Sequence, residues 1–273
     1  MVGMERVADQ FDSLLDTARV NQRRKEAGLP VATDSNHLVF TGPPGTGKTT
    51  IARELARAYK GLGITANDKV VETNRAGLVG QYVNNISQTA QKKFGEAKGG
   101  VLFVDEAYEL ARDDYGRQAL TQLMADMENN REDTVVILAG YPKEMGKLMK
   151  ANPGLQSRLP KTIDFPAYDA DALAKIGRGM LREGQYVGKP GTGEKIKEAA
   201  ETIAATPGHG NARDMRNLTQ EIRRAQARRI ANEPDARLEL LHPEDVDEAV
   251  ASMKLTRPVK GSKGRQGRLK AVS

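Results

Sequence analysis

The stretch Gly42–Thr49 reads GPPGTGKT and decides the fold. It follows a short apolar run at residues 37–40 and precedes residues 49–60, where apolar side chains recur at helical spacing. A glycine-rich loop between a strand and a helix lets backbone N–H groups converge on phosphates, and the helix N-terminus adds partial positive charge. The spacing therefore predicts a phosphate-binding loop that takes a nucleoside triphosphate.

Two side chains of this loop have specific expected roles. Lys48 is expected to reach the β- and γ-phosphates, and the Thr49 hydroxyl is expected to ligate Mg²⁺. A second glycine-rich run at residues 190–193 has no Lys or Ser/Thr in register, so we expect only a turn there. The residues expected to hold the nucleotide in the first loop are Gly42, Pro43, Pro44, Gly45, Thr46, Gly47, Lys48, Thr49 and Thr50.

A second motif, VLFVDE at residues 101–106, places two acids at the end of an apolar strand. By itself this pattern fits either a solvated turn or a catalytic site. Downstream of a phosphate-binding loop, Asp105 is expected to hold Mg²⁺ directly or through water. Glu106 is expected to orient the attacking water as general base.

The pattern along the chain is typical of an α/β fold, a five-stranded parallel sheet with helices on both faces. Strands are predicted at residues 37–40, 70–71, 101–104, 134–139 and 162–165, with amphipathic helices between them. After Pro166 the pattern predicts helices only. We expect an α/β nucleotide-binding domain at 1–168, a small all-helical lid domain at 169–253 and a basic disordered tail at 254–273.

Composition narrows the class of protein. The 273 residues contain no Cys, which excludes thiolate catalysis and fits a reducing compartment. No apolar run is long enough for membrane insertion and no signal peptide is visible, so we expect a cytoplasmic protein. The net charge of +6 comes from the tail, which holds seven basic residues and no acid, so the rest is near neutral. That tail is either solvated and disordered or a contact for nucleic acid or an acidic partner.

Phosphoryl transfer needs positive charge at the γ-phosphate, and two arginines are candidates. Arg158 lies in NPGLQSR, where a neighbouring subunit could present it, and Arg213 lies in GNAR at the start of a helix. Each is otherwise an ordinary surface arginine. Tyr82 lies in a glycine-containing stretch and is either a loop aromatic that grips a polypeptide or a packed core residue.

With these motifs in view, the sequence resembles the AAA+ superfamily, and within it the CbbX/CfxQ type. That type includes red-type Rubisco activases, the C-terminal ATPase module of EccA-type secretion proteins, and SpoVK-like sporulation proteins. The resemblance covers about residues 2–250. The matching segments are VGMERV (2–7), HLVFTGPPGTGKTTIA (37–52), LVGQY (78–82), GGVLFVDEAYEL (99–110), DYGRQAL (114–120), MENNRED (127–133), VVILAGY (135–141), NPGLQSR (152–158) and GNARDMRN (210–217).

The resemblance implies roles that spacing leaves open. Arg158 is similar to an arginine finger acting in trans, and Arg213 to the sensor-2 arginine acting in cis. Tyr82 resembles the aromatic of pore loop 1, but the sequence continues Val-Asn-Asn where relatives have hydrophobic-Gly-His, so substrate specificity does not carry over. Val2 and Gly3 match the segment that packs on adenine.

Tyr141 falls near the sensor-1 position. The family forms hexameric rings with ATP between subunits. Since the chain begins at the adenine-packing segment, we expect a motor without the helical-repeat domain of the secretion-type relatives.

The expected function is therefore that of an ATP-hydrolysing homohexameric motor that uses Mg²⁺ and remodels an unknown protein substrate through central pore loops. One alternative is a Rubisco activase. Another is a nucleic-acid-associated ATPase, such as a loader or phage accessory, that uses the basic tail. A third is a scaffold that uses ATP as a switch, against which Glu106 and Arg158 argue because both serve hydrolysis.

Overall fold

The computed structural model describes residues 3–31, 35–80 and 85–255. The chain divides into two compact units. The first comprises residues 1–168 together with the short segment Gly210–Arg213, and the second comprises residues 169–209 and 214–273. Within the described residues, no helix combines the length and the hydropathy that a membrane crossing needs.

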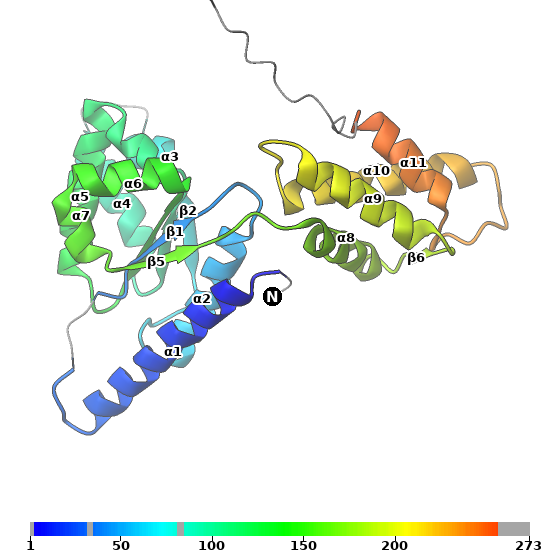
Figure 1. The fold of residues 1–273 in the computed structure, drawn as a ribbon. Helices are drawn as coiled ribbons and strands as arrows, with labels where there is room; N and C mark the ends of the chain where they lie inside the picture. The colour runs from blue at the N-terminus through cyan, green and yellow to red at the C-terminus, as the bar shows by residue number, and fades with distance from the viewer. Residues whose placement is uncertain (1–2, 32–34, 81–84, 256–273) are drawn as a thin grey trace, which may run out of the picture. The chain divides into compact units, whose positions relative to one another are not determined.

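The first unit is an α/β domain whose strands and helices alternate along the chain (Figure 1). Its strands are β1 (Leu38–Thr41), β2 (Val70–Thr73), β3 (Val101–Val104), β4 (Val135–Gly140) and β5 (Lys161–Asp164). Its helices are α1 (Glu5–Glu26), α2 (Lys48–Gly61), α3 (Arg75–Val79), α4 (Ile86–Glu96), the 3₁₀ helix η2 (Ala107–Ala111), α5 (Asp114–Asn129), α6 (Pro142–Ala151) and α7 (Pro153–Arg158).

The five strands form one parallel sheet in the order β2-β3-β4-β1-β5, which confirms the predicted sheet. The phosphate-loop strand β1 lies between β4 and β5, with Leu38 paired to Ile137 and to Lys161. The strand that precedes the two acids, β3, pairs with β2 on one side and with β4 on the other. Because all five strands are parallel, their carboxyl ends share one edge of the sheet, and ligands of such folds bind at that edge.

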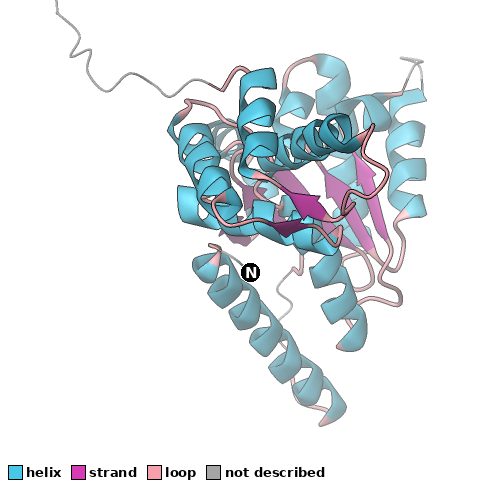
Figure 2. Ribbon diagram, turned by 90° about the vertical axis from the view of Figure 1, so that its right-hand side faces the viewer, coloured by secondary structure: helices cyan, strands magenta, loops and turns pink. Residues whose placement is uncertain are grey.

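Side chains of the strands alternate between two hydrophobic cores, one on each face of the sheet. Figure 2 shows the strands of the sheet in magenta among the cyan helices. In β3, Leu102 and Val104 pack with α3, α4, α5, α6 and α7, whereas Val101 and Phe103 pack with α1 and α2. Burial on both faces explains why the strands read as continuous apolar runs.

The second unit contains α8 (Ala170–Glu183), α9 (Thr192–Ala205), α10 from Asp214 onward (the helix spans Ala212–Ile230) and α11 (Pro243–Ser252). The prediction of helices only is wrong at two points, because β6 (Val187–Gly188) and β7 (Leu240–Leu241) form a short parallel ladder. Each strand is two residues long, which is too short for any alternation of side chains to show in the sequence.

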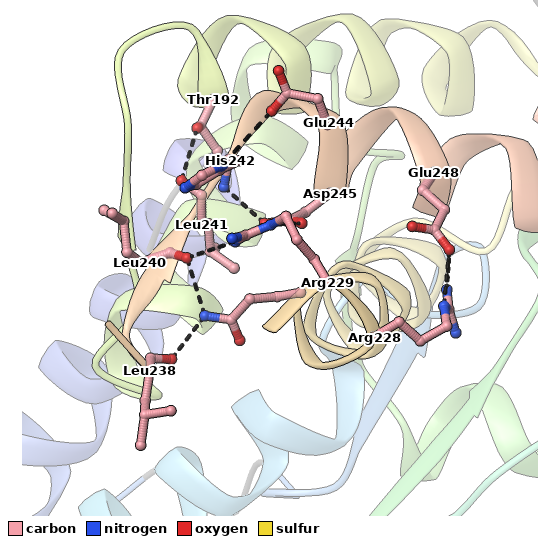
Figure 3. A network of polar contacts seen from close by, with 11 residues as sticks. Thr192, Arg228, Arg229, Leu238, Leu240, Leu241, His242, Glu244, Asp245 and Glu248 are labelled. Carbon is pink, nitrogen blue, oxygen red and sulfur yellow. Dashed lines mark hydrogen bonds and ion pairs between the residues drawn. The ribbon is translucent and has the colours of Figure 1, made fainter. Parts of the chain in front are cut away.

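A buried ion pair organises this unit (Figure 3). Arg229 donates to both carboxylate oxygens of Asp245, at 2.8 and 2.9 Å, and to the carbonyl oxygen of Leu240 at 3.1 Å. Asp245 is 2% exposed and also accepts from the backbone N–H of His242 at 2.8 Å, closing a capping box at the start of α11. The pair of Arg229 and Asp245 thus connects α10, β7 and α11.

A candidate nucleotide-binding site

The phosphate-binding loop connects the carboxyl end of β1 to the start of α2. The Gly42 N–H donates to the carbonyl oxygen of Gly140 at 3.1 Å, which extends the β1–β4 ladder by one step. Lys48 folds back over the loop, and its ammonium donates to the carbonyl oxygens of Gly42 at 2.9 Å and Pro43 at 2.7 Å. The ammonium therefore lies within the curve of the loop, where a phosphate would replace those carbonyls as its partner.

Gly45 sits at the tightest point of the site. Its φ is +71°, in the left-handed region that favours glycine, and a Cβ atom there would lie 2.0 Å from the carbonyl oxygen of Gly210. The Ala212 N–H donates to the Gly45 carbonyl oxygen at 3.1 Å. The segment Gly210–Arg213 therefore lies directly against the phosphate-binding loop, although about 165 residues separate Gly45 from Gly210 in the sequence.

Asn211 fastens this segment to the loop. Its side chain is fully buried, donates from Nδ2 to the Pro44 carbonyl oxygen at 3.0 Å, and accepts the Tyr168 N–H at 2.9 Å. The Tyr168 hydroxyl in turn donates to the Thr46 carbonyl oxygen at 3.3 Å. Asn211 has a φ of 54°, which asparagine tolerates better than most residues. Arg213 lies two residues after Asn211, so these contacts fix the backbone position from which the Arg213 side chain extends.

The two acids stand at the end of β3, on the same edge. The Asp105 N–H continues the ladder by donating to the Thr73 carbonyl oxygen at 2.9 Å, and the Asp105 carboxylate accepts the Glu106 N–H at 3.0 Å. Glu106 has a φ of 50°, an unusual conformation for a glutamate. Both side chains are exposed, so both carboxylates are accessible to a ligand.

Three charged groups act on the pKa of Lys48. Burial lowers the pKa of Lys48, the carboxylate of Asp105 opposes that by raising it, Arg213 lowers it and Glu106 raises it. Interactions of this kind reach only nearby charges. Of the predicted site residues, Asp105, Glu106 and Arg213 thus lie within electrostatic range of Lys48.

A pair of tyrosines flanks the acids. Tyr141 directly follows β4, and its ring centroid lies 6.0 Å from that of Tyr108, which comes two residues after Glu106. Burial, and then the charge of Glu106, raises the pKa of Tyr108 to about 12, so its hydroxyl stays protonated at neutral pH. Tyr141, which the resemblance places near the sensor-1 position, is thus one member of an aromatic pair with Tyr108.

Arg158 lies apart from this group. It ends α7, and the charged group beside it is Glu128, with Arg158 Nε 3.2 Å from Glu128 Oε2. Its Nη1 donates to the Gly154 carbonyl oxygen at 3.0 Å.

Gly3 adopts a left-handed φ of 64° just before α1. Val2 and Tyr82 lie outside the described residues.

The donor chemistry fits a nucleotide with its metal. A hydroxyl and a carboxylate, on Thr49 and Asp105, offer the oxygen ligands that Mg²⁺ prefers, and the loop offers backbone N–H groups and an ammonium to phosphates.

Sequence reasoning missed Asn211, Tyr168 and Glu128. Asn211 precedes Arg213 by two residues and Glu128 lies in the segment MENNRED, but nothing in the spacing indicated what either would contact.

Comparison with known proteins identifies two matching families. Residues 38–167 match the family described as "ATPase family associated with various cellular activities (AAA)", and residues 169–255 match the AAA lid domain. The chain is 37% identical over 236 residues to stage V sporulation protein K of Bacillus subtilis, covering 84% of this chain and 73% of that protein.

Two further relatives have other names. The chloroplastic ribulose bisphosphate carboxylase/oxygenase activase of Cyanidioschyzon merolae is 36% identical, with 87% of this chain and 83% of that protein covered. The ESX-1 secretion system protein EccA1 of Mycobacterium leprae is 35% identical, and the match spans 92% of this chain but only 48% of EccA1.

Among solved structures, the AAA domain of FIGL-1 in complex with ADP superposes with a TM-score of 0.63 at 19% identity, covering 88% of this chain and 80% of that one. At that identity the likeness concerns the fold alone. The family matches and the relatives, taken with the loop, the acids and the sheet order, lead to one conclusion: this chain belongs to the AAA+ ATPases of the CbbX/CfxQ type and is a nucleotide-binding enzyme that hydrolyses ATP.

Proposed function

We propose that this ATPase assembles into a homohexameric ring that remodels a protein substrate, with one ATP site at each subunit interface. The separation of the charged residues supports this. Lys48, Asp105, Glu106 and Arg213 gather at the phosphate-binding loop, whereas Arg158 pairs with Glu128 of its own chain elsewhere in the α/β unit. An arginine finger can act in trans on a neighbour's γ-phosphate, and the position of Arg158 away from its own loop supports that role.

Each residue then has a defined part. The phosphate-binding loop and Lys48 would hold the triphosphate, and Thr49 and Asp105 would hold Mg²⁺, which would supply positive charge beside the phosphate oxygens. Glu106 takes the proton of the attacking water, which attacks the γ-phosphorus as the bond to the β-phosphate oxygen breaks. Arg158 of the neighbour and Arg213 stabilise the charge on the transferring group.

The segment Gly210–Arg213 supports a route from hydrolysis to movement. The chain passes from the α/β unit into the second unit after Tyr168 and again after Arg213, and Asn211 ties both of these points to the phosphate-binding loop. A change in the loop on phosphate release therefore reaches both connections at once. We propose that this drives a rigid-body movement of the lid domain, and that Tyr82 moves a polypeptide along the pore.

The substrate is proposed only by class, as a protein or protein complex. The relatives are named for sporulation, secretion and Rubisco activation, which are three different systems with one shared motor. The Rubisco activase relative, matched over 83% of its length, favours that activity as the second candidate. Incubating the protein and ATP with inhibited red-type Rubisco decides it, and recovery of carboxylase activity is the result that supports it.

The main test uses Glu106→Gln. This variant is expected to bind ATP like the unmodified chain but to hydrolyse it about 10²–10⁴-fold more slowly, because the general base is lost. Mass photometry of this variant with ATP and Mg²⁺ should show a hexamer, and affinity capture in the same state should retain the substrate. Near-normal turnover contradicts the catalytic assignment, and a monomer at all concentrations contradicts the ring.

A further inference from the structure

The segment MENNRED, residues 127–133, forms a hydrogen-bonded support at the end of α5. Asn130 closes the helix: its backbone N–H and its side-chain Nδ2 both donate to the Asp126 carbonyl oxygen, at 3.1 and 2.9 Å. The Asp133 N–H donates to the Asn130 carbonyl oxygen at 3.2 Å. Hydrogen bonds therefore join the backbone before Glu128 to the backbone after it.

A buried histidine anchors this support to the sheet. His37, 1% exposed and placed directly before β1, accepts the Val136 N–H of β4 at its Nδ1, at 3.0 Å. The proton consequently resides on Nε2, which donates to the Met127 carbonyl oxygen at 3.1 Å. The residue immediately before Glu128 is thus fastened to the two central strands, one of which carries the phosphate-binding loop.

Glu128 projects from this support between two arginines. Its Oε2 lies 3.2 Å from Arg158 Nε, and its Oε1 lies 3.4 Å from Arg131 Nη1. With Nη1 of Arg158 donating to the Gly154 carbonyl oxygen, the guanidinium is held by one hydrogen bond and by its ion-pair contact with Glu128. The Nε of Arg158 lies close to the carboxylate without an aligned hydrogen-bond acceptor among the described residues, so the contact is an electrostatic one that the arginine can release.

These groups line a small polar pocket of about 150 Å³ together with His37 and Ser157. The side chain of Arg158 is 28% exposed and that of Glu128 47% exposed, so both remain accessible from solvent. An anion that approached this pocket would meet the guanidinium of Arg158 already oriented.

We propose that Glu128 is a positioning residue for Arg158: its carboxylate holds the guanidinium at the end of α7 in the orientation that it needs to enter a neighbour's ATP site. The inference rests on the proposed trans role of Arg158. It assigns to the segment MENNRED a part in catalysis that neither its sequence nor the comparisons give it.

The reason is geometric. Arginine has a long side chain with many rotamers, and its planar fork is useful only when pre-oriented. A misplacement of about 1 Å at a reacting centre can cost about 10²-fold in rate. Loss of Glu128 leaves Arg158 charged and present but without its second anchor, so the rate should fall while ATP affinity stays the same.

A mixing experiment isolates this effect. Arg158→Ala subunits keep a complete ATP site but offer no finger, and Glu106→Gln subunits offer a finger but cannot hydrolyse. Neither is active alone, and the mixture should regain ATPase activity because each intact site receives the other's Arg158. Glu106→Gln/Glu128→Gln subunits then replace the second partner. We expect kcat of the mixture to fall about 10- to 100-fold with KM for ATP unchanged.

Each result is informative. No activity in the first mixture refutes the trans role itself. Activity in the first mixture and equal or higher activity in the second overturns the role of Glu128 while leaving the trans role intact. Loss of co-assembly in the second mixture, seen by mass photometry, also overturns it, since Glu128 would then be an interface residue. The matched control is Glu106→Gln/Glu132→Gln, which neutralises an exposed neighbouring acid and should restore activity fully.

Discussion

Asn211 donates a hydrogen bond to the carbonyl oxygen of Pro44 at 3.0 Å, although 167 residues separate the two. The same amide accepts the backbone N–H of Tyr168. One buried side chain therefore joins the phosphate-binding loop to both points at which the chain passes between its two units.

Replacing Asn211 with Ala should weaken ATP binding about tenfold. The substitution leaves the Pro44 carbonyl and the Tyr168 N–H without this partner, and an unsatisfied buried polar group costs about 1–3 kcal/mol. Titration with a fluorescent ATP analogue measures the change. Asn217→Ala, a substitution on α10 in the second unit, serves as the control; equal affinities of the two variants would contradict the role given to Asn211.

Gly45→Ala should destabilise the α/β unit by about 2 kcal/mol or more, because a Cβ atom would meet the Gly210 carbonyl oxygen at 2.0 Å in a backbone conformation unfavourable for alanine. Gly146→Ala is the matched control. Gly146 lies inside α6, a Cβ there meets no atom within 4 Å, and the change should stabilise by about 0.5–1 kcal/mol. Urea unfolding compares them, and a loss of stability in both variants would point to a general intolerance of alanine.

The stability of the protein should fall as the pH drops below about 6.5, in part through His37. Burial lowers the pKa of His37, and the weaker effects of its neighbours do not restore it. The unfolded chain therefore takes up a proton at a pH where the folded chain does not, and stability decreases from about pH 6.5 down to the lowered pKa. His37→Asn, which keeps an acceptor for Val136 but cannot titrate, should unfold with a shallower pH dependence between pH 7 and 5. Identical slopes would rule out His37 as the source.

Arg229→Met should destabilise the second unit by about 3 kcal/mol, since it leaves the carboxylate of Asp245 buried without its cation. Arg228 provides the comparison one residue earlier on the same helix (Figure 3). Its ion pair with Glu248 is about half exposed on both sides, so Arg228→Met should cost less than 1 kcal/mol. Thermal unfolding followed by circular dichroism tests the pair, and similar melting temperatures would contradict the assignment.

Local patterns were enough to predict the sheet and the phosphate-binding loop. The strand at residues 101–104 has the bounds that its apolar run indicated, because burial on both faces leaves no polar position in it. The strands β6 and β7 were missed because two residues carry no periodic signal, and they pair across some 50 residues of chain. The site also combines residues that local patterns predict with residues that they do not. Lys48 and Asp105 are recognisable from their spacing, whereas Asn211 is not.

The sequence by itself determined the chemistry that can be carried out. A glycine loop, a lysine and two acids after an apolar strand are local features, written in consecutive residues, and they specify a nucleotide and its hydrolysis. Only the tertiary structure decided which distant residues support them. Asn211 on Pro44, and Glu128 on Arg158, are contacts between segments that meet because the core packs them together. Such partners leave no periodic trace in a sequence, since their positions depend on how helices and strands pack and not on spacing along the chain.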